Sequence, residues 1–154
     1  MNKSRAFRDA LGRYPTGVAV VTTFRGGVAM GMTINSFASV SLDPMLVLWS
    51  IDRASERYDI FRDAEDYAIN VLAHDQSGWA SLCAQAPDLQ SNNVTWSGEA
   101  APLVDAAVAR FTCRRHAVYP GGDHDIIVGE VTDMDSPRDV AALEFYRGSY
   151  SSAG

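Results

Sequence analysis

A series of short segments rich in β-branched residues, separated by turn residues, constrains the fold of this chain most strongly. Gly17 to Phe24 is the first segment, residues 25–27 (Arg-Gly-Gly) form a turn, and Val28 to Asn35 supplies the second arm of a predicted β-hairpin. Further strand-like segments cover residues 45–51, 67–72, 108–119, 125–133 and 143–150. Short strands at such intervals favour a mainly β fold that closes as an antiparallel barrel.

Three short helices are expected around the strands. Phe7, Leu11 and Tyr14 recur at helical spacing, so a first helix is expected to pack its apolar side on the segment that follows it. Ser55 and Asp75 are suitable caps for two further helices. The last of these helices is predicted to bury Trp79, Leu82 and Cys83.

Length and charge exclude several classes of protein. A chain of 154 residues with 47% hydrophobic residues supports one sizeable core, so residues 1–154 are expected to form a single domain. The formal net charge of −6, without a cluster of Lys and Arg, argues against nucleic acid as a partner. No apolar run approaches the roughly 20 residues that a membrane helix needs, and the N-terminus lacks a signal-peptide core. We therefore expect a cytoplasmic protein without a membrane partner.

Residues 33–44 place hydroxyl and amide side chains in an otherwise apolar segment that has no positive charge. An unpaired polar group in the interior costs on the order of 1–3 kcal/mol, so such side chains need partners. A polar ligand would supply them; alternatively, the hydroxyls lie at strand ends and satisfy their own backbone. A second unusual segment, residues 121–125 (Gly-Gly-Asp-His-Asp), places the imidazole of His124 beside flexible backbone.

These two segments, together with residues 129–131 (Gly-Glu-Val), resemble the flavin reductase-like family of FMN-binding split barrels. The similarity runs from about Phe7 to Tyr150, and its longest motif is Gly31 to Pro44. The resemblance implies a split antiparallel β-barrel of the Greek-key, FMN-binding type with a few short peripheral helices. It also implies the activity of the reductase components of two-component flavin-dependent monooxygenases. In that activity NADH or NADPH reduces FMN or FAD, and the reduced flavin passes to a partner monooxygenase.

The resemblance also implies which residues contact the flavin. Hydroxyl and amide groups suit both of its ends, because ring carbonyls and ribityl and phosphate groups all take hydrogen bonds, and a helix start favours an anion. The ring edge is assigned to Thr33, Asn35 and Ser36. The other implied cofactor-binding residues, towards the ribityl and phosphate end and its helix start, are Ser39, Ser41, Ser50, Ser55 and Arg57, with Arg53 beside them.

By the same resemblance, His124 lies beside the nicotinamide and orients it over the flavin. Hydride transfer requires stacked rings with reacting atoms about 3–3.5 Å apart, and no strong acid, nucleophile or metal. Loss of His124 is therefore expected to raise KM more than it lowers kcat. Alternatively, His124 is an ordinary turn histidine. No metal site is expected, because Cys113 and His116, the pair nearest to a zinc-ligand spacing, would point to opposite faces of a strand.

Two other functions stay open: a tightly flavin-bound oxidase or oxygenase-like enzyme that acts on an organic substrate, and a non-catalytic flavin-binding module. Residues 84–109 contain no Lys or Arg, which departs from the family pattern near the phosphate end and leaves the choice between FMN and FAD open. A homodimer is expected, because a partner would cover the apolar loop of residues 85–103. Alternatively, this loop packs on its own barrel.

Overall fold

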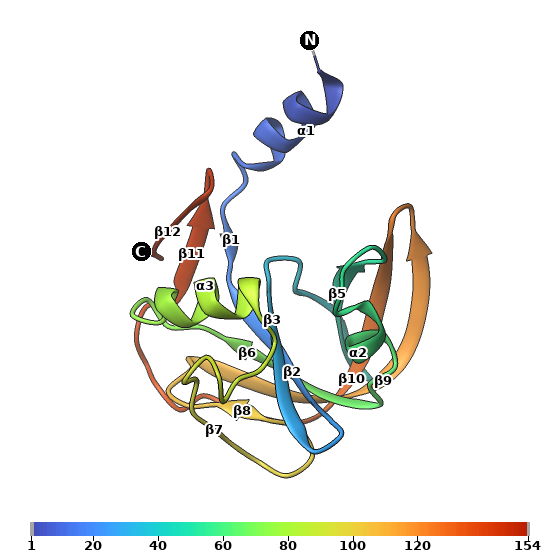
Figure 1. The fold of residues 1–154 in the computed structure, drawn as a ribbon, viewed down its shortest axis with the longest axis vertical. Coiled ribbons are helices and arrows are strands. Elements are labelled where there is room, and N and C mark those ends of the chain that lie inside the picture. The colour runs from blue at the N-terminus through green and yellow to red at the C-terminus, as the bar shows by residue number, and fades with distance from the viewer. Residues whose placement is uncertain (1, 154) are drawn as a thin grey trace.

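The computed structural model describes residues 2–153, and over these residues antiparallel strands dominate, as predicted (Figure 1). The helices are α1 (Lys3–Leu11), α2 (Tyr58–Arg62) and α3 (Ser77–Gln85). The strands are β1 (Thr16–Gly17), β2 (Ala19–Arg25), β3 (Val28–Ile34), β4 (Ala38–Leu42), β5 (Met45–Asp52), β6 (Asp66–Val71), β7 (Trp96–Ser97), β8 (Leu103–Val104), β9 (Ala109–Gly121), β10 (His124–Asp135), β11 (Leu143–Tyr146) and β12 (Ser149–Ser152). No helix within this described part of the chain is long and apolar enough to cross a membrane.

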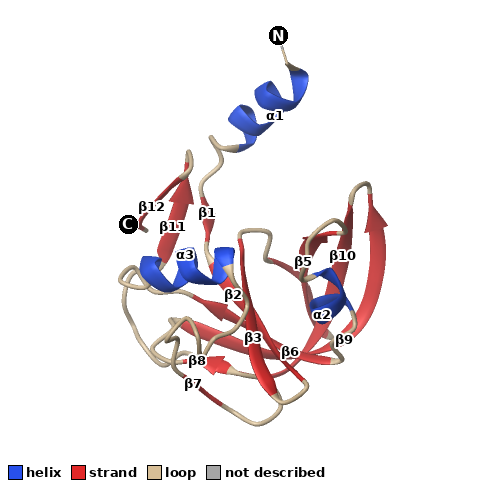
Figure 2. Cartoon of the chain, viewed as in Figure 1, coloured by secondary structure: helices blue, strands red, loops and turns tan. Residues whose placement is uncertain are grey.

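Seven strands form one antiparallel sheet in the order β3-β2-β6-β9-β10-β5-β4, which curls around the main core (Figure 2). Trp49 is fully buried in this core and packs edge-on against Phe61 and Tyr67, with ring centroids 6.0 and 6.2 Å away. The two edge strands, β3 and β4, are consecutive in the chain. Residues 35–37, called the seam segment below, therefore bridge the two open edges of the sheet.

A second apolar layer covers the outer face of β2, β3 and β6. It contains α3 and the loop of residues 86–104, whose Leu89 and Val94 are buried. The Leu89 N–H donates to the Ala29 carbonyl of β3 at 3.1 Å, which ties the loop to the sheet edge. The loop therefore packs on its own barrel through the side chains of Leu89 and Val94.

Helix α1 stands away from the rest of the chain, as Figure 1 shows. None of its residues is buried, and the side chains of Phe7, Leu11 and Tyr14 are 66%, 56% and 73% exposed. The prediction that this helix packs its apolar side on the following segment is wrong for the single chain. The reason is that the chain continues into β1, which pairs with β11 and does not turn back beneath the helix.

Strands β1, β11 and β12 form a separate three-stranded antiparallel sheet. The predicted strand over residues 143–150 is thus two strands, and a two-residue turn separates them. The turn residues Arg147 and Gly148 have φ angles of 50° and 79°, the backbone that matches the twist of a tight hairpin.

Two details of α3 differ from the prediction. Asp75 does not cap the helix; its carboxylate binds Arg138 at 2.7 Å instead. Leu82 is 42% exposed, whereas Ala80 and Cys83 are buried. The helix packs on the barrel through Ala80 and Cys83, three residues apart on one face, so Leu82 points away from that face.

Candidate functional site

Ser36 fastens the seam segment to β5. Its hydroxyl accepts a hydrogen bond from the Ser50 N–H at 3.0 Å and donates to the Ser50 carbonyl at 3.4 Å. The side chain thereby replaces the strand partner that the seam segment lacks. The fold thus brings Ser36 and Ser50, two of the predicted cofactor-binding residues, side by side.

Two adjoining cavities open on the seam segment. The larger measures about 410 Å³ and is lined by Tyr14, Pro15, Thr16, Gly17, Val18, Ala19, Asn35, Ser36, Phe37, Ala38 and Val71. The smaller measures about 150 Å³ and is lined by Val18, Thr33, Ile34, Asn35, Phe145 and Tyr150. The volume of the larger cavity lies in the range typical of ligand pockets. Asn35 borders both cavities, so its exposed amide is the polar side chain that they share.

Two threonine hydroxyls at these cavities differ in their bonding. The Thr33 hydroxyl donates to the Ala80 carbonyl of α3 at 2.6 Å, so the fold already uses it. The Thr16 hydroxyl is buried and has no hydrogen-bond partner among residues 2–153. A buried unpaired hydroxyl costs on the order of 1–3 kcal/mol. Because Thr16 lines the larger cavity, a ligand with a polar edge would satisfy it.

Ser39 and Ser41 belong to β4, a strand that the sequence did not separate from its surroundings. Ser39 pairs with Val47 and Ser41 with Leu46 on β5, and the register shifts between the two serines. Neither serine lines either cavity at the seam segment. The structure therefore places them along the edge of the sheet that leads away from Asn35.

Arg57 and Ser55 lie at the joint between α2 and α3. Arg57 is 9% exposed and donates to the Cys83 carbonyl and, at 3.1 Å, to the Ala84 carbonyl, where α3 ends. Burial lowers the pKa of its guanidinium. The Ser55 hydroxyl accepts from the Arg57 N–H at 3.1 Å; Ser55 lies two residues before the cap position, which Arg57 occupies. The structure does not bring either residue to the cavities.

His124 begins β10 directly after the turn that joins it to β9, and its side chain is 39% exposed. The His124 Nδ1 lies 2.7 Å from a carboxylate oxygen of Asp123. A carboxylate only accepts, so Nδ1 carries the proton and Nε2 is left for another partner. The imidazole holds the pKa of Asp123 below its usual range.

Arg53 fastens the turn before His124 to the barrel. Its Nε donates to Asp125 Oδ1 at 2.8 Å, and its Nη1 donates to the Gly122 carbonyl at 2.8 Å. The Tyr58 hydroxyl donates to the other carboxylate oxygen of Asp125. Sequence reasoning placed Arg53 near the flavin phosphate and missed the role of Asp125, because no local pattern links two residues 72 positions apart.

The acid stability of this turn follows from the same contacts. The hydrogen bonds from Tyr58 and Arg53 hold the pKa of Asp125 below its usual value of about 3.9. A lowered native-state pKa stabilises the fold above the unfolded-state pKa, and this stabilisation is lost as the pH falls through the native-state pKa. We expect Asp125→Asn to lower the urea midpoint near neutral pH, and the midpoints of the two proteins to converge as the pH falls through the lowered native-state pKa of Asp125. If wild type and Asp125→Asn still differed equally in urea midpoint in stronger acid, Asp125 would not be the source of this stabilisation.

Sheet register fixes the position of His124 relative to the seam segment. His124 pairs with Asp52 and Ile126 pairs with Ser50 across β10 and β5. Paired residues share a face, so His124 and Ser50 both lie on the outer face of the barrel, opposite the buried Trp49. Two residues along and one strand across correspond to about 8 Å between Cα atoms. His124 thus lies near the seam segment but borders neither cavity.

The sequence did not assign the aromatic wall of the smaller cavity to the site. Phe145 and Tyr150 pair across the β11–β12 hairpin, and their rings lie 5.4 Å apart at a tilt of 56°. The alternation of apolar residues in this hairpin is that of any half-buried strand, so it carried no signal for a ligand.

Comparison with known proteins agrees with this architecture. The family model of the flavin reductase like domain matches residues 11–154. A protein of Agrobacterium fabrum named FMN reductase (NADH) SmoA is 46% identical over 149 residues, which cover 96% of this chain and 84% of that protein. The reductase component of a flavin-dependent trigonelline monooxygenase of Acinetobacter baylyi is 43% identical over 153 residues, 97% of this chain. The chain spans about half (49%) of the length of that relative.

A solved structure has the same fold. The NADH:FAD oxidoreductase SgcE6 of Streptomyces globisporus superposes with a TM-score of 0.89 at 37% identity, over 96% of this chain and 92% of that one. The predicted split-barrel fold and the predicted family are both confirmed. With its sheet split at the seam segment and the family match over residues 11–154, the chain belongs to the flavin reductase-like family.

Proposed function

We propose that this chain is an NAD(P)H-dependent flavin reductase that transfers a hydride from nicotinamide to FMN or FAD and supplies reduced flavin to a separate monooxygenase. The observation that carries the proposal is the unpaired Thr16 hydroxyl beside the exposed Asn35 amide at the larger cavity. Both groups are suited to the polar edge of an isoalloxazine ring. When bound, the flavin supplies the hydride acceptor, and the chain holds and orients the rings.

The residues at and near the seam segment have separate roles in binding and orienting the rings. Asn35 and Thr16 bind the ring edge, while Ser36 holds the segment that carries Asn35 in place. His124 orients the nicotinamide from the neighbouring strand, with its Nδ1 fixed by Asp123. Ser50, one strand from His124, remains a candidate contact for the flavin. Nothing in this scheme needs an acid or nucleophile, because stacking and orientation are the main requirements of hydride transfer.

The names of the relatives support the choice of substrates. One is an FMN reductase that uses NADH, one is the reductase component of a monooxygenase, and SgcE6 is named for NADH and FAD and was also solved with NAD and FAD fragments. We therefore assign NADH as the first nucleotide to test and a flavin-dependent monooxygenase as the partner. Residues 1–154 would act as one domain in the cytoplasm.

NADH oxidation with and without added flavin tests the proposal. A shuttle reductase purifies nearly colourless and consumes NADH only when FMN or FAD is added. A protein that purifies yellow and turns over without added flavin would instead be a bound-flavin oxidase or oxygenase-like enzyme. A protein that binds flavin but does not oxidise NADH or NADPH would be a flavin-binding module.

Thr16→Val separates a ligand contact from a structural contact. The substitution keeps the shape of the side chain and removes a hydroxyl that has no partner among the described residues, so the stability of the flavin-free protein is expected to stay equal or rise. The affinity for FMN, measured by fluorescence quenching, is expected to fall about fivefold. Thr22→Val is the control: its hydroxyl is bonded, so it should lower stability and leave affinity unchanged. Unchanged FMN affinity in Thr16→Val would exclude this contact.

A homodimer is part of the proposal, and α1 is its contact element. Phe7 and Leu11 lie on one side of the helix and are exposed. Residues 2–14 carry four basic residues and one acidic residue, whereas the whole chain has a net charge of −6. The charges of Lys3 and Arg5 are complementary to the acidic body of a second copy, and packing there would cover the apolar side of the helix.

The dimer is tested by sedimentation equilibrium. The double substitution Phe7→Ser and Leu11→Ser is expected to shift the full chain from dimer to monomer and to leave the fold of the monomer intact, because neither side chain is buried in the single chain. Val140→Ser, at a 40% exposed position outside the helix, is the matched control and should leave the dimer intact. A dimer that survived the double substitution would refute the role of α1.

A further inference from the structure

The arginines of this chain fall into two groups. Every arginine from position 53 to position 138 binds a carboxylate or a backbone carbonyl. In contrast, no hydrogen bond or ion pair to a described residue engages the guanidinium groups of Arg5, Arg8, Arg13, Arg25 and Arg147; Arg25 lies alone at the β2–β3 turn, and the other four lie on or beside α1. Arg147 only lies over the Tyr146 ring, 5.4 Å from its centroid. Free guanidinium groups gathered in one place, in a chain of net charge −6, call for an anion.

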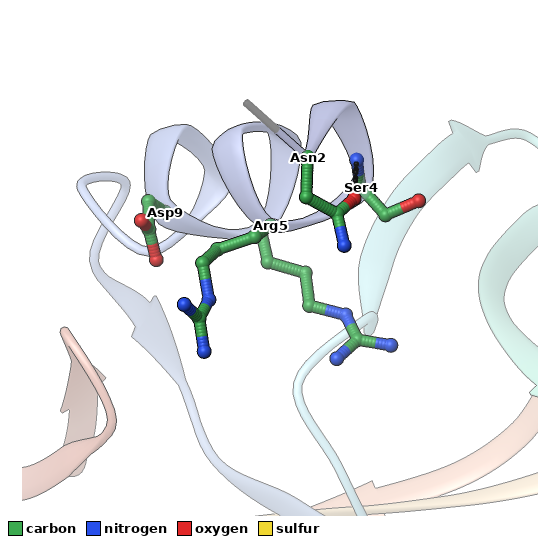
Figure 3. Close-up of a pocket in the computed structure, with 5 residues that line it drawn as sticks. Asn2, Ser4, Arg5 and Asp9 are labelled. Carbon is green, nitrogen blue, oxygen red and sulfur yellow. Dashed lines mark hydrogen bonds between the residues drawn. The ribbon is translucent and has the colours of Figure 1, made fainter.

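Three of these arginines share one hollow between the end of α1 and the tip of the β11–β12 hairpin. The hollow measures about 460 Å³, and its lining residues are Arg8, Asp9, Gly12, Arg13, Arg147 and Gly148. Three positive charges thus face one negative charge. A second hollow along the same helix side adds Arg5, and Figure 3 shows its side chains extending away from the α1 backbone.

The hairpin turn is built to present Arg147. A tight turn of this type favours Asn or Gly at its first position, because φ is positive there, yet the chain has arginine with φ of 50°. The Arg147 N–H donates to the Gly12 carbonyl at 3.0 Å, which ties the tip of the hairpin to the end of α1. The strained turn and this hydrogen bond together hold Arg147 beside Arg13.

The hollow lies next to the candidate site. Phe145 lines the smaller cavity and is two residues before Arg147, about 7 Å along the strand. Tyr14 lines the larger cavity and directly follows Arg13. A dinucleotide whose ring lies at Asn35 can therefore extend towards the arginines. The absence of Lys and Arg from residues 84–109, and the use of Arg57 by α3, leave few other cations for its phosphates.

We propose that Arg8, Arg13 and Arg147 form a binding site for the diphosphate of a dinucleotide. The site extends the proposed flavin and nicotinamide cavities, and in this sense the inference rests on the proposed function. FAD and NADH both contain an adenosine diphosphate unit, so the shared chemistry is a nucleoside diphosphate. Arginine suits it, since the planar guanidinium binds phosphate oxygens in pairs.

The first test measures binding of ADP and of adenosine to the full chain by calorimetry, and it needs no flavin reduction. Wild type is expected to bind ADP more tightly than adenosine, and added salt should weaken ADP binding. Arg13→Gln and Arg147→Gln should each weaken ADP binding about five- to tenfold and leave adenosine binding unchanged. Arg25→Gln is the matched control, because Arg25 is an exposed arginine at the distant β2–β3 turn. Equal affinities for ADP and adenosine in wild type, or equal ADP affinities in Arg147→Gln and Arg25→Gln, would overturn the site.

The second test identifies the source of the diphosphate. If FAD provides it, the double variant Arg13→Gln and Arg147→Gln binds FAD more weakly and keeps its affinity for riboflavin. If NADH provides it, the KM for NADH rises at saturating flavin. If the double variant changes neither the affinity for FAD nor the KM for NADH, the proposal is refuted. A chain that lacks reductase activity but shows the ADP difference would refute the proposed function and keep the diphosphate site.

Discussion

His124→Ala is expected to raise the KM for NADH about tenfold while kcat changes less than about threefold. The imidazole has its Nδ1 held by Asp123 at 2.7 Å, so in the role proposed for His124 the other ring nitrogen, Nε2, would contact the nicotinamide. Losing this contact weakens binding and orientation of the nucleotide, but it removes no group that takes part in hydride transfer. Steady-state kinetics at saturating FMN measure both constants.

His116→Ala is the matched control, because His116 is exposed on the neighbouring strand β9. It should leave both constants unchanged. His124→Asn, which retains a polar side chain, is expected to recover part of the affinity for NADH. A loss of about a hundredfold in kcat at constant KM would instead assign a chemical step to His124. No change at all would make it an ordinary turn residue.

Gly129→Ala is expected to destabilise the fold by about 3 kcal/mol, the largest effect on stability that the structure predicts. A Cβ at position 129 would lie 2.0 Å from the Tyr67 hydroxyl oxygen and 3.2 Å from the Cys113 Cβ. All these atoms belong to the main core, where close packing leaves little room to move. Urea denaturation of both proteins gives the difference in unfolding free energy.

Two further variants make this result specific. Gly78→Ala, on an exposed part of α3 where a Cβ meets no atom within 4 Å, should be neutral or stabilising. The Tyr67 hydroxyl is buried without a partner among residues 2–153, so Tyr67→Phe alone should be mild. Combined with Gly129→Ala, it removes the nearest atom and should restore part of the lost stability. Equal stabilities of Gly129→Ala and wild type would contradict the packing seen here.

The sequence predicted those parts of the fold that depend on residues close together in the chain. The hairpin of residues 17–35 was predicted from its β-branched arms and its glycine turn, and it forms as β2 and β3, with β1 before it. Cys113, which was not expected to bind a metal, is fully buried in the main core, and this burial raises the pKa of its thiol to about 12. Helix α1 does form and does carry apolar residues on one side. The spacing of Phe7 and Leu11 does not indicate what they pack against, however, and both stay exposed in the single chain.

The site was predicted less completely, because the partners of its polar residues lie far away in the sequence. Thr33 and Arg57 both carried the pattern of a flavin contact, yet their hydrogen bonds go to carbonyls of α3, 47 and 26 residues away. Asn35 and Ser36 do lie at the cavities, since the split of the sheet leaves their segment without a strand partner. Thr16 was not predicted as a site residue because it lies in the two-residue strand β1, which is too short to show a pattern in the sequence.

The most direct test of the central claim is anaerobic reduction of excess FMN by NADH with a catalytic amount of the protein. A reductase that releases reduced flavin is expected to bleach the visible absorbance of all the FMN, with one NADH consumed for each FMN. Bleaching that stops at an amount of FMN equal to the protein, or no bleaching with either NADH or NADPH, would contradict the account.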